Sequence, residues 1–191
     1  HLIDPKSAAA AVTSKTRAIM PVQLNGRTAN MDEIQKICDQ HGLFIVEDAA
    51  QALGSKFRGR FAGTFGKAGT FSFYPAKLLG CFGDGGGVST NNDEVARQVR
   101  LLRDHGRDDS GEFVAWGTNG RLDNLQAAIL AFKLGHFPKD IQRRRDIAAQ
   151  YQAKLSQIAE LVLPPAPSEG DHFDIYQNYE IEAESRDGLK E

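Results

Sequence analysis

The chain has 191 residues, of which 41% are hydrophobic and 25% charged, as is usual for a soluble globular protein with a core. The formal net charge of -2 argues against a nucleic-acid-binding surface, and no apolar run approaches the ~20 residues of a membrane span. Cys38 and Cys81 lack metal-ligand spacing and fit free thiols in a reducing compartment. With no signal peptide visible, we expect a cytoplasmic protein that binds no metal, nucleic acid or membrane.

The first half of the chain predicts a strand, a helix and a second strand. Residues 18–22 are apolar and predict a short buried strand. Residues 31–41 repeat apolar side chains at helical spacing, and Gly42 is a typical helix end. Residues 43–46 predict a second buried strand, which leads into Glu47 and Asp48. Elements of these lengths predict a βαβ unit with two parallel strands and a right-handed crossover.

Lys77 follows the next predicted strand. Residues 54–69 predict a loop with short strand pieces, residues 70–74 a strand, and residues 88–90 a short antiparallel strand. A carboxylate and an amine at the ends of two buried strands indicate an active site at one edge of the sheet. An exposed lysine after a strand is the plain alternative. The glycine-rich residues 83–87 either let the backbone pass close to Lys77 or form a flexible loop.

Helices dominate the second half. Residues 93–104 predict a helix capped by Asn91 or Asn92 and ended by Gly106. His105 is therefore interpreted as part of this helix end and not as a general base. Gly135 ends the next predicted helix, and residues 138–158 predict a longer one. The apolar face of the shorter helix comprises Leu122, Leu125, Ala128, Ile129 and Phe132.

The basic run and the last predicted elements complete the chain. Residues 143–145, three arginines flanked by aspartates, predict a solvated helix face. The proline-rich residues 164–167 predict a rigid connection and a domain boundary. Residues 175–181 alternate loosely and predict a strand, and Ser185 predicts another helix start. The chain lacks an initial Met and ends just after that start, so we expect an internal fragment of a longer protein.

The residues at the predicted sheet edge match the needs of a pyridoxal phosphate enzyme. Such an enzyme needs a lysine for the aldehyde and a carboxylate that keeps the pyridine nitrogen protonated. It also needs hydroxyl or N–H groups for the phosphate. Lys77, Asp48 and Ser72 provide one group of each kind.

Several motifs resemble the DegT/DnrJ/EryC1/StrS aminotransferases, which are fold-type I pyridoxal phosphate enzymes that act mostly on nucleotide-linked keto sugars. The resemblance covers most of residues 15–155. It implies an α/β fold, with a mixed, mainly parallel sheet and flanking helices in a partial large domain over residues 1–163. Residues 164–191 would then begin a smaller α+β domain. The motifs are Glu47–Ala52, Gly69–Lys77, Gly83–Val88, His105–Arg107, Thr118–Arg121 and Gln126–Ala128.

The resemblance also implies a role for each site residue. Lys77 would form the internal aldimine and carry the proton, while Asp48 would pair with the pyridine nitrogen. Ala50 would pack on the ring and Gln51 would bond near its phenolic oxygen. Ser72 would bind the phosphate. As plain alternatives, Asp48 is a helix cap, Ala50 a core residue and Gln51 a surface residue.

Three further residues would serve the neighbouring subunit or the substrate. Asn119 would reach the cofactor phosphate of a second subunit, which implies a homodimer; its alternative is a turn residue. Arg121 would serve the same region or a substrate phosphate, or else only start a helix. Gln177 stands where many members carry a histidine near the sugar. The N-terminal groups that cup the phosphate and stack on the ring in full-length members are not visible.

These assignments predict an aminotransferase that moves an amino group from glutamate to a nucleotide-linked keto sugar, in polysaccharide biosynthesis. The alternatives are a dehydratase relative, in which a histidine replaces the lysine, and a regulatory or cofactor-binding protein without turnover. Lys77 argues against the dehydratase, and Lys77 with Asp48 argues against the regulatory protein.

Overall fold

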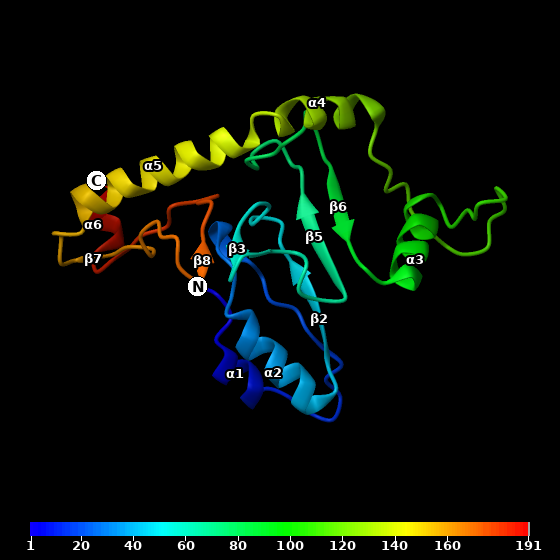
Figure 1. Ribbon diagram of the computed structural model, residues 1–191, viewed down its shortest axis with the longest axis horizontal. Helices are drawn as coiled ribbons and strands as arrows, with labels where there is room; N and C mark the ends of the chain where they lie inside the picture. Colours follow the sequence, from blue (N-terminus) through cyan, green and yellow to red (C-terminus); the bar gives the residue numbers. More distant parts are fainter. Residues whose placement is uncertain (191) are drawn as a thin grey trace.

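The computed structural model describes residues 1–190, and its centre is a four-stranded sheet in the order β1-β2-β5-β6. The strands β1 (Ala18–Ile19), β2 (Phe44–Asp48) and β5 (Ala68–Ser72) run parallel. The last strand, β6 (Gly86–Ser89), is antiparallel to β5. This mixed, mainly parallel sheet with helices around it is the predicted α/β fold (Figure 1).

The predicted βαβ unit is confirmed. Helix α2 (Met31–His41) begins where the Asn30 side chain accepts a hydrogen bond from the Glu33 N–H at 3.2 Å. It ends at Gly42, whose φ of 63° is the left-handed conformation that glycine adopts most easily. Its apolar face packs on the sheet side chains Ile19 and Ile45. A short helix, α1 (Pro5–Ala10), lies beside α2 (Figure 1).

The strand that leads to Lys77 begins and ends two residues earlier than predicted. Gly69 makes the earlier start possible, because a Cβ there would lie only 2.2 Å from the Gly63 carbonyl oxygen. Beyond the strand, the Phe73 N–H donates to the Gly85 carbonyl at 2.8 Å. The other end of the predicted glycine loop, Gly86 and Gly87, pairs with β5 as part of β6.

Short strands form two smaller sheets, and the predicted strand over residues 175–181 is wrong. β3 (Lys56–Phe57) lies between β4 (Arg60–Phe61) and β8 (His172–Phe173), while β7 (Leu161–Val162) pairs with β9 (Glu182–Ala183). Between β8 and β9 the backbone is irregular. Tyr176 has a φ of 51°, which a strand does not allow. The Arg144 side chain takes the carbonyl groups of residues 176 and 177, which a strand would use in pairing.

Helix α3 (Asp93–Arg103) is capped by Asn92, which accepts a hydrogen bond from the Val95 N–H at 2.9 Å. The first left-handed residue after the helix is His105, with a φ of 61°. The sequence predicted Gly106 for this position, and Gly106 is the next residue. Gly106 then donates its N–H to the Leu101 carbonyl at 3.0 Å, the 6→1 bond of a Schellman motif. The last helix, α6 (Arg186–Lys190), starts directly after Ser185, as predicted.

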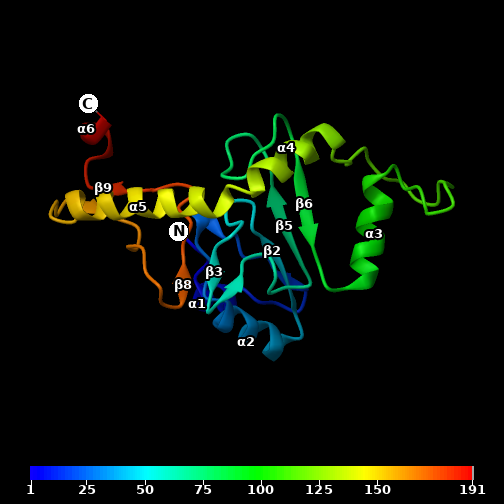
Figure 2. The ribbon, with the colours of Figure 1, turned by 45° about the horizontal axis from the view of Figure 1, so that its top comes forward.

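Helices α4 (Asn124–Leu134) and α5 (Phe137–Leu155) follow one another across the carboxyl ends of β2 and β5 (Figures 1 and 2). Two residues of the apolar face predicted for α4, Leu125 and Phe132, are 71% and 73% exposed and do not pack on the sheet. The side that packs inward carries Leu130, which is 8% exposed. It joins a core cluster that ties both helices to the segment after Lys77; its buried members are Leu79, Cys81, Leu130, Phe137, Ile141 and Ile175.

The arginine run on α5 is only partly the solvated face that its sequence predicts, because Arg143 is exposed and Arg145 is buried. The Arg145 side chain is only 5% exposed and donates to the carbonyl oxygens of Asp174 and Ser168, both at 3.0 Å. Residues 168 and 174 therefore contact α5, and the domain boundary at residue 164 stays a prediction. Both cysteines are free and buried. Within residues 1–190, no helix has the length and apolar composition needed to cross a membrane.

Candidate active site

The carboxyl ends of β2 and β5 bring the predicted catalytic residues to one edge of the sheet. The two strands pair in parallel, with Asp48 opposite Thr70. Asp48 is the last residue of β2 and Ser72 the last residue of β5. Ligands of open α/β sheets bind outside the carboxyl ends of the strands, so this edge is the natural place for a site.

Strand alternation sends the neighbouring carboxylates Glu47 and Asp48 to opposite faces. Glu47 is fully buried and accepts hydrogen bonds from the Gln23 side chain and the Gly63 N–H, both at 2.8 Å. The N–H groups of Phe65 and Gly66 donate to its second oxygen at 2.5 and 3.2 Å. These four donors make Glu47 a structural residue that fixes the loop behind β2.

Asp48 instead faces the site. It is half-buried, and its Oδ1 accepts the Ala50 N–H at 3.1 Å, which closes the turn after β2. Its Oδ2 has no hydrogen-bond partner within residues 1–190, so this oxygen can still accept a proton donor. Gln51, in the same turn, accepts the Asn25 backbone N–H at 2.8 Å through its Oε1, which leaves its amide nitrogen to donate.

Lys77 lies in a turn held from both sides. Its N–H donates to the Tyr74 carbonyl at 2.9 Å, and the Cys81 N–H returns to the Phe73 carbonyl at 2.8 Å. The Lys77 side chain is half-buried, and the described part of the chain offers its amine no hydrogen bond or ion pair. The Ser72 hydroxyl accepts the Tyr74 N–H at 3.2 Å and keeps its own proton to donate.

The structure gathers five of the predicted site residues around one small cavity. Ala50 and Gln51 come from the turn after β2, Ser72 from the end of β5, and Lys77 from the turn that follows. Gln177 closes the cavity from the C-terminal segment. The apolar wall of the cavity consists of Leu53, Leu78, Leu79 and Ile175. Asp48 lies directly beside this cavity through its bond to Ala50.

Gln177 contacts the backbone of the lysine turn. Its Nε2 donates to the Ala76 carbonyl at 3.1 Å, and its Oε1 accepts the Leu78 N–H at 3.0 Å. The sequence placed Gln177 near the substrate, and no sequence signal pointed to these two backbone contacts. Asn25, which bonds to Gln51, was not among the predicted site residues.

Asn119 and Arg121 lie outside the cavity. Both are exposed and belong to the connection between α3 and α4, which extends away from the sheet (Figure 2). Asn119 pairs through its backbone with Asp104, and Arg121 forms an ion pair with the Asp104 carboxylate at 3.1 Å. Within one copy of this chain, neither residue is brought to Lys77.

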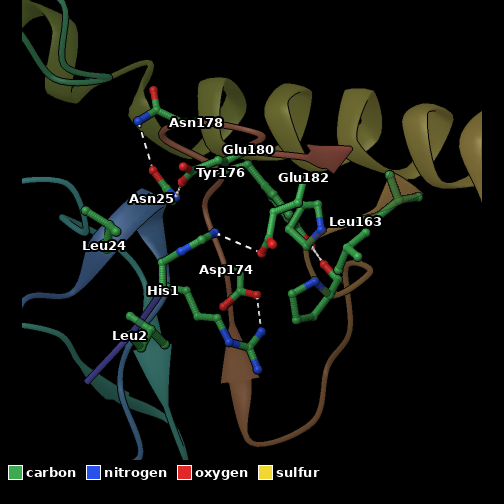
Figure 3. Close-up of a pocket in the computed structure, with 14 residues that line it drawn as sticks. His1, Leu2, Leu24, Asn25, Leu163, Asp174, Tyr176, Asn178, Glu180 and Glu182 are labelled. Carbon is green, nitrogen blue, oxygen red and sulfur yellow. Dashed lines mark hydrogen bonds and ion pairs between the residues drawn. The ribbon is translucent and has the colours of Figure 1, made fainter. Parts of the chain in front are cut away.

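A second cavity, of about 180 Å³, lies where the start of the chain meets the C-terminal segment (Figure 3). Asn178 donates to the Asn25 side chain at 3.0 Å on one side of it, and Asp174 pairs with Arg27 at its base. Burial raises the pKa of Asp174, while the Arg27 guanidinium acts in the opposite direction. No residue that lines this cavity also lines the lysine cavity.

Comparison with known proteins identifies relatives over nearly the whole chain. A pleiotropic regulatory protein of Geobacillus stearothermophilus is 43% identical over 98% of this chain and 50% of its own length. The dTDP-3-amino-3,4,6-trideoxy-alpha-D-glucose transaminase of Streptomyces venezuelae is 42% identical over 98% of this chain and 49% of its own length. The chain thus spans about half the length of these curated relatives.

A solved structure and a family model agree with these relatives. The crystal structure of S. venezuelae DesV in complex with a ketimine intermediate superposes with a TM-score of 0.92 at 42% identity, over 98% of this chain and 50% of that one. The model of the DegT/DnrJ/EryC1/StrS aminotransferase family matches residues 1–191. The chain therefore belongs to the DegT/DnrJ/EryC1/StrS aminotransferase family.

Proposed function

We propose that the protein carrying this chain is a pyridoxal phosphate-dependent aminotransferase that aminates a keto group of a nucleotide-linked sugar, with glutamate as the amino donor. One observation carries the proposal. Three groups lie at the carboxyl ends of two parallel strands: a lysine amine and a carboxylate oxygen that have no partner within residues 1–190, and a serine hydroxyl. The named transaminase among the relatives supports the substrate class.

The residues of the cavity fit pyridoxal phosphate. The Asp48 Oδ2 is available to accept the proton of the pyridine nitrogen, and the Gln51 amide nitrogen is available to donate to the phenolic oxygen. Ala50, with its single methyl group, would pack against one face of the ring. The Ser72 hydroxyl can donate to the phosphate.

Lys77 would carry the chemistry. Bound pyridoxal phosphate supplies an aldehyde that takes up the amino group and a ring that draws electrons from the reacting carbon. The Lys77 amine would hold this aldehyde and, when free, would move a proton at the substrate carbon. The overall exchange would convert glutamate to 2-oxoglutarate and the keto group of the sugar to an amine. The two half-reactions share one bound cofactor, so ping-pong kinetics follow.

Asn119 and Arg121 would complete the site of a second copy. Both side chains lie on an exposed connection, and a contact with another subunit's cofactor requires this kind of exposure. The proposed assembly is therefore a homodimer with shared sites. The proposal also includes a cytoplasmic location and a role in polysaccharide biosynthesis, since both fit a nucleotide-linked sugar substrate.

Borohydride reduction of the intact protein with pyridoxal phosphate tests the proposal. Peptide mapping should place the phosphopyridoxyl group on Lys77. A Lys77→Arg variant keeps the positive charge but should give no adduct. A reduced protein without modification at Lys77 would reject the aminotransferase. An adduct without amination of any keto sugar would favour the regulatory alternative, which the name of one relative also raises.

A further inference from the structure

Gln177 bonds to the two peptide groups that flank Lys77. The Ala76 carbonyl, which accepts from its Nε2 at 3.1 Å, belongs to the peptide before Lys77. The Leu78 N–H, which donates to its Oε1 at 3.0 Å, belongs to the peptide after Lys77. Since each peptide is planar, the orientation of these two planes sets the φ and ψ angles of Lys77. One side chain therefore restrains both backbone angles of the lysine.

The backbone of Gln177 is itself held firmly. The Arg144 Nη1 donates to the carbonyl oxygens of Tyr176 and Gln177, both at 3.0 Å. The Tyr176 hydroxyl donates to the Pro165 carbonyl at 2.7 Å. On the opposite side, a Cβ at Gly26 would lie 2.7 Å from the Gln177 nitrogen, so the two segments are in close contact. Gln177 is only 9% exposed.

The chemistry of the amide explains why this residue is a glutamine. One of its bonds needs a donor and the other an acceptor, and a terminal amide provides both. A glutamate could accept from Leu78 but could not donate to Ala76. A leucine of similar size could do neither and would leave two polar backbone groups without their partner.

We propose that Gln177 is a positioning residue that fixes the direction of the Lys77 side chain through the peptide groups on both sides. This role rests on the proposed function of Lys77. It is an alternative to the contact with the sugar that the sequence predicted, since each polar atom of the amide already has one backbone partner. Through Gln177, Arg144 and the C-terminal segment hold the lysine turn in place.

Hydrogen exchange in the cofactor-free intact protein tests this role without catalysis. In Gln177→Leu, the Leu78 amide should exchange about tenfold faster than in the parent protein, because a buried acceptor is lost. In Gln177→Glu, Leu78 should keep its protection, because the carboxylate still accepts its N–H. Unchanged exchange at Leu78 in Gln177→Leu would contradict the positioning role of Gln177.

Kinetics separate positioning from substrate binding. Both Gln177 variants should lower kcat and the rate of borohydride-trapped adduct formation at Lys77, with the KM for the sugar within about twofold of the parent. A raised sugar KM with unchanged kcat would instead assign Gln177 to the substrate. If the parent protein forms no adduct at Lys77, the proposed function fails. The exchange experiment would still test whether Gln177 restrains the backbone around Lys77.

Gln126→Leu is the matched control. Gln126 also holds a backbone segment at two points, accepting the Phe82 N–H at 2.7 Å and donating to the Phe82 carbonyl at 2.9 Å. Its loss should leave Leu78 exchange and adduct formation unchanged. The same loss in both leucine variants would show a general loosening of the loop and contradict a specific role for Gln177.

Discussion

The lysine cavity and the connection between α3 and α4 carry predicted site residues in opposite surroundings. In the lysine cavity, the side chains of Gln177 and Gln51 form hydrogen bonds with backbone groups. The residues of the apolar wall of this cavity belong to a core cluster. Around Asn119 the chain is exposed, and Trp116 nearby is 100% exposed. The predicted catalytic lysine thus lies beside a core cluster, whereas the predicted cross-subunit residue lies on an outward segment.

The largest effect should come from the lysine side of this comparison. Lys77→Arg should lower kcat for amination by about 10³-fold or more, because the guanidinium cannot replace the amine as nucleophile and proton carrier. Steady-state assays with glutamate and a panel of nucleotide keto sugars measure this. The fold should persist, since the Lys77 amine has no partner within residues 1–190. Retained activity would remove Lys77 from the mechanism.

The support behind the cavity comes next. Glu47→Ala should lower the free energy of unfolding by about 3 kcal/mol, because two buried and two partly buried donors lose their acceptor. Urea unfolding measures the change. Asp48→Asn, at the next position of the same strand, is the control and should change stability far less. Similar losses in both variants would contradict the separation of a structural and a functional carboxylate.

A smaller effect should come from the outward segment. Asn119→Ala should reduce amination about tenfold if Asn119 contacts the cofactor phosphate of another copy. Mixing this variant with Lys77→Ala should restore about one quarter of the parent activity, because half of randomly formed dimers are mixed and each holds one intact site. Activity that stays at the sum of the two variants would contradict a shared site.

The smallest effect concerns the strand that leads to Gln177. Burial lowers the pKa of His172 below its ordinary value of 6.5, so the unfolded chain binds a proton that the folded chain disfavours. Stability should therefore fall as pH drops through 6.5 toward the folded-state pKa. His172→Phe, which keeps the contact with the Phe57 ring, should weaken this fall in urea unfolding across that range. An unchanged pH dependence would contradict the assignment.

Local signals explain which parts of the fold the sequence predicted. Helix α2 begins at the cap residue Asn30 and ends at the left-handed Gly42, and both roles depend only on neighbouring residues in the sequence. Two apolar strands around this helix were enough to predict the parallel pair. Cofactor chemistry and the family motifs then identified Lys77, Asp48 and Ser72 as candidates at the sheet edge.

The errors come from contacts between distant segments. Arg145 looks solvated in sequence, but its acceptor at Asp174 lies 29 residues away. The loose alternation of residues 175–181 resembles a strand until Arg144 takes two of its carbonyls. The contacts of Gln177 with the lysine turn span about a hundred residues and leave no periodic signal. Such contacts follow only from tertiary packing.

The first half-reaction can be measured without the sugar substrate. The intact protein, loaded with pyridoxal phosphate and given glutamate without sugar, should release one equivalent of 2-oxoglutarate per Lys77 site and then stop. Addition of the correct keto sugar should restart the release. Failure to form 2-oxoglutarate from glutamate or any other amino donor, while Lys77 carries the cofactor, would contradict an aminotransferase built on this lysine.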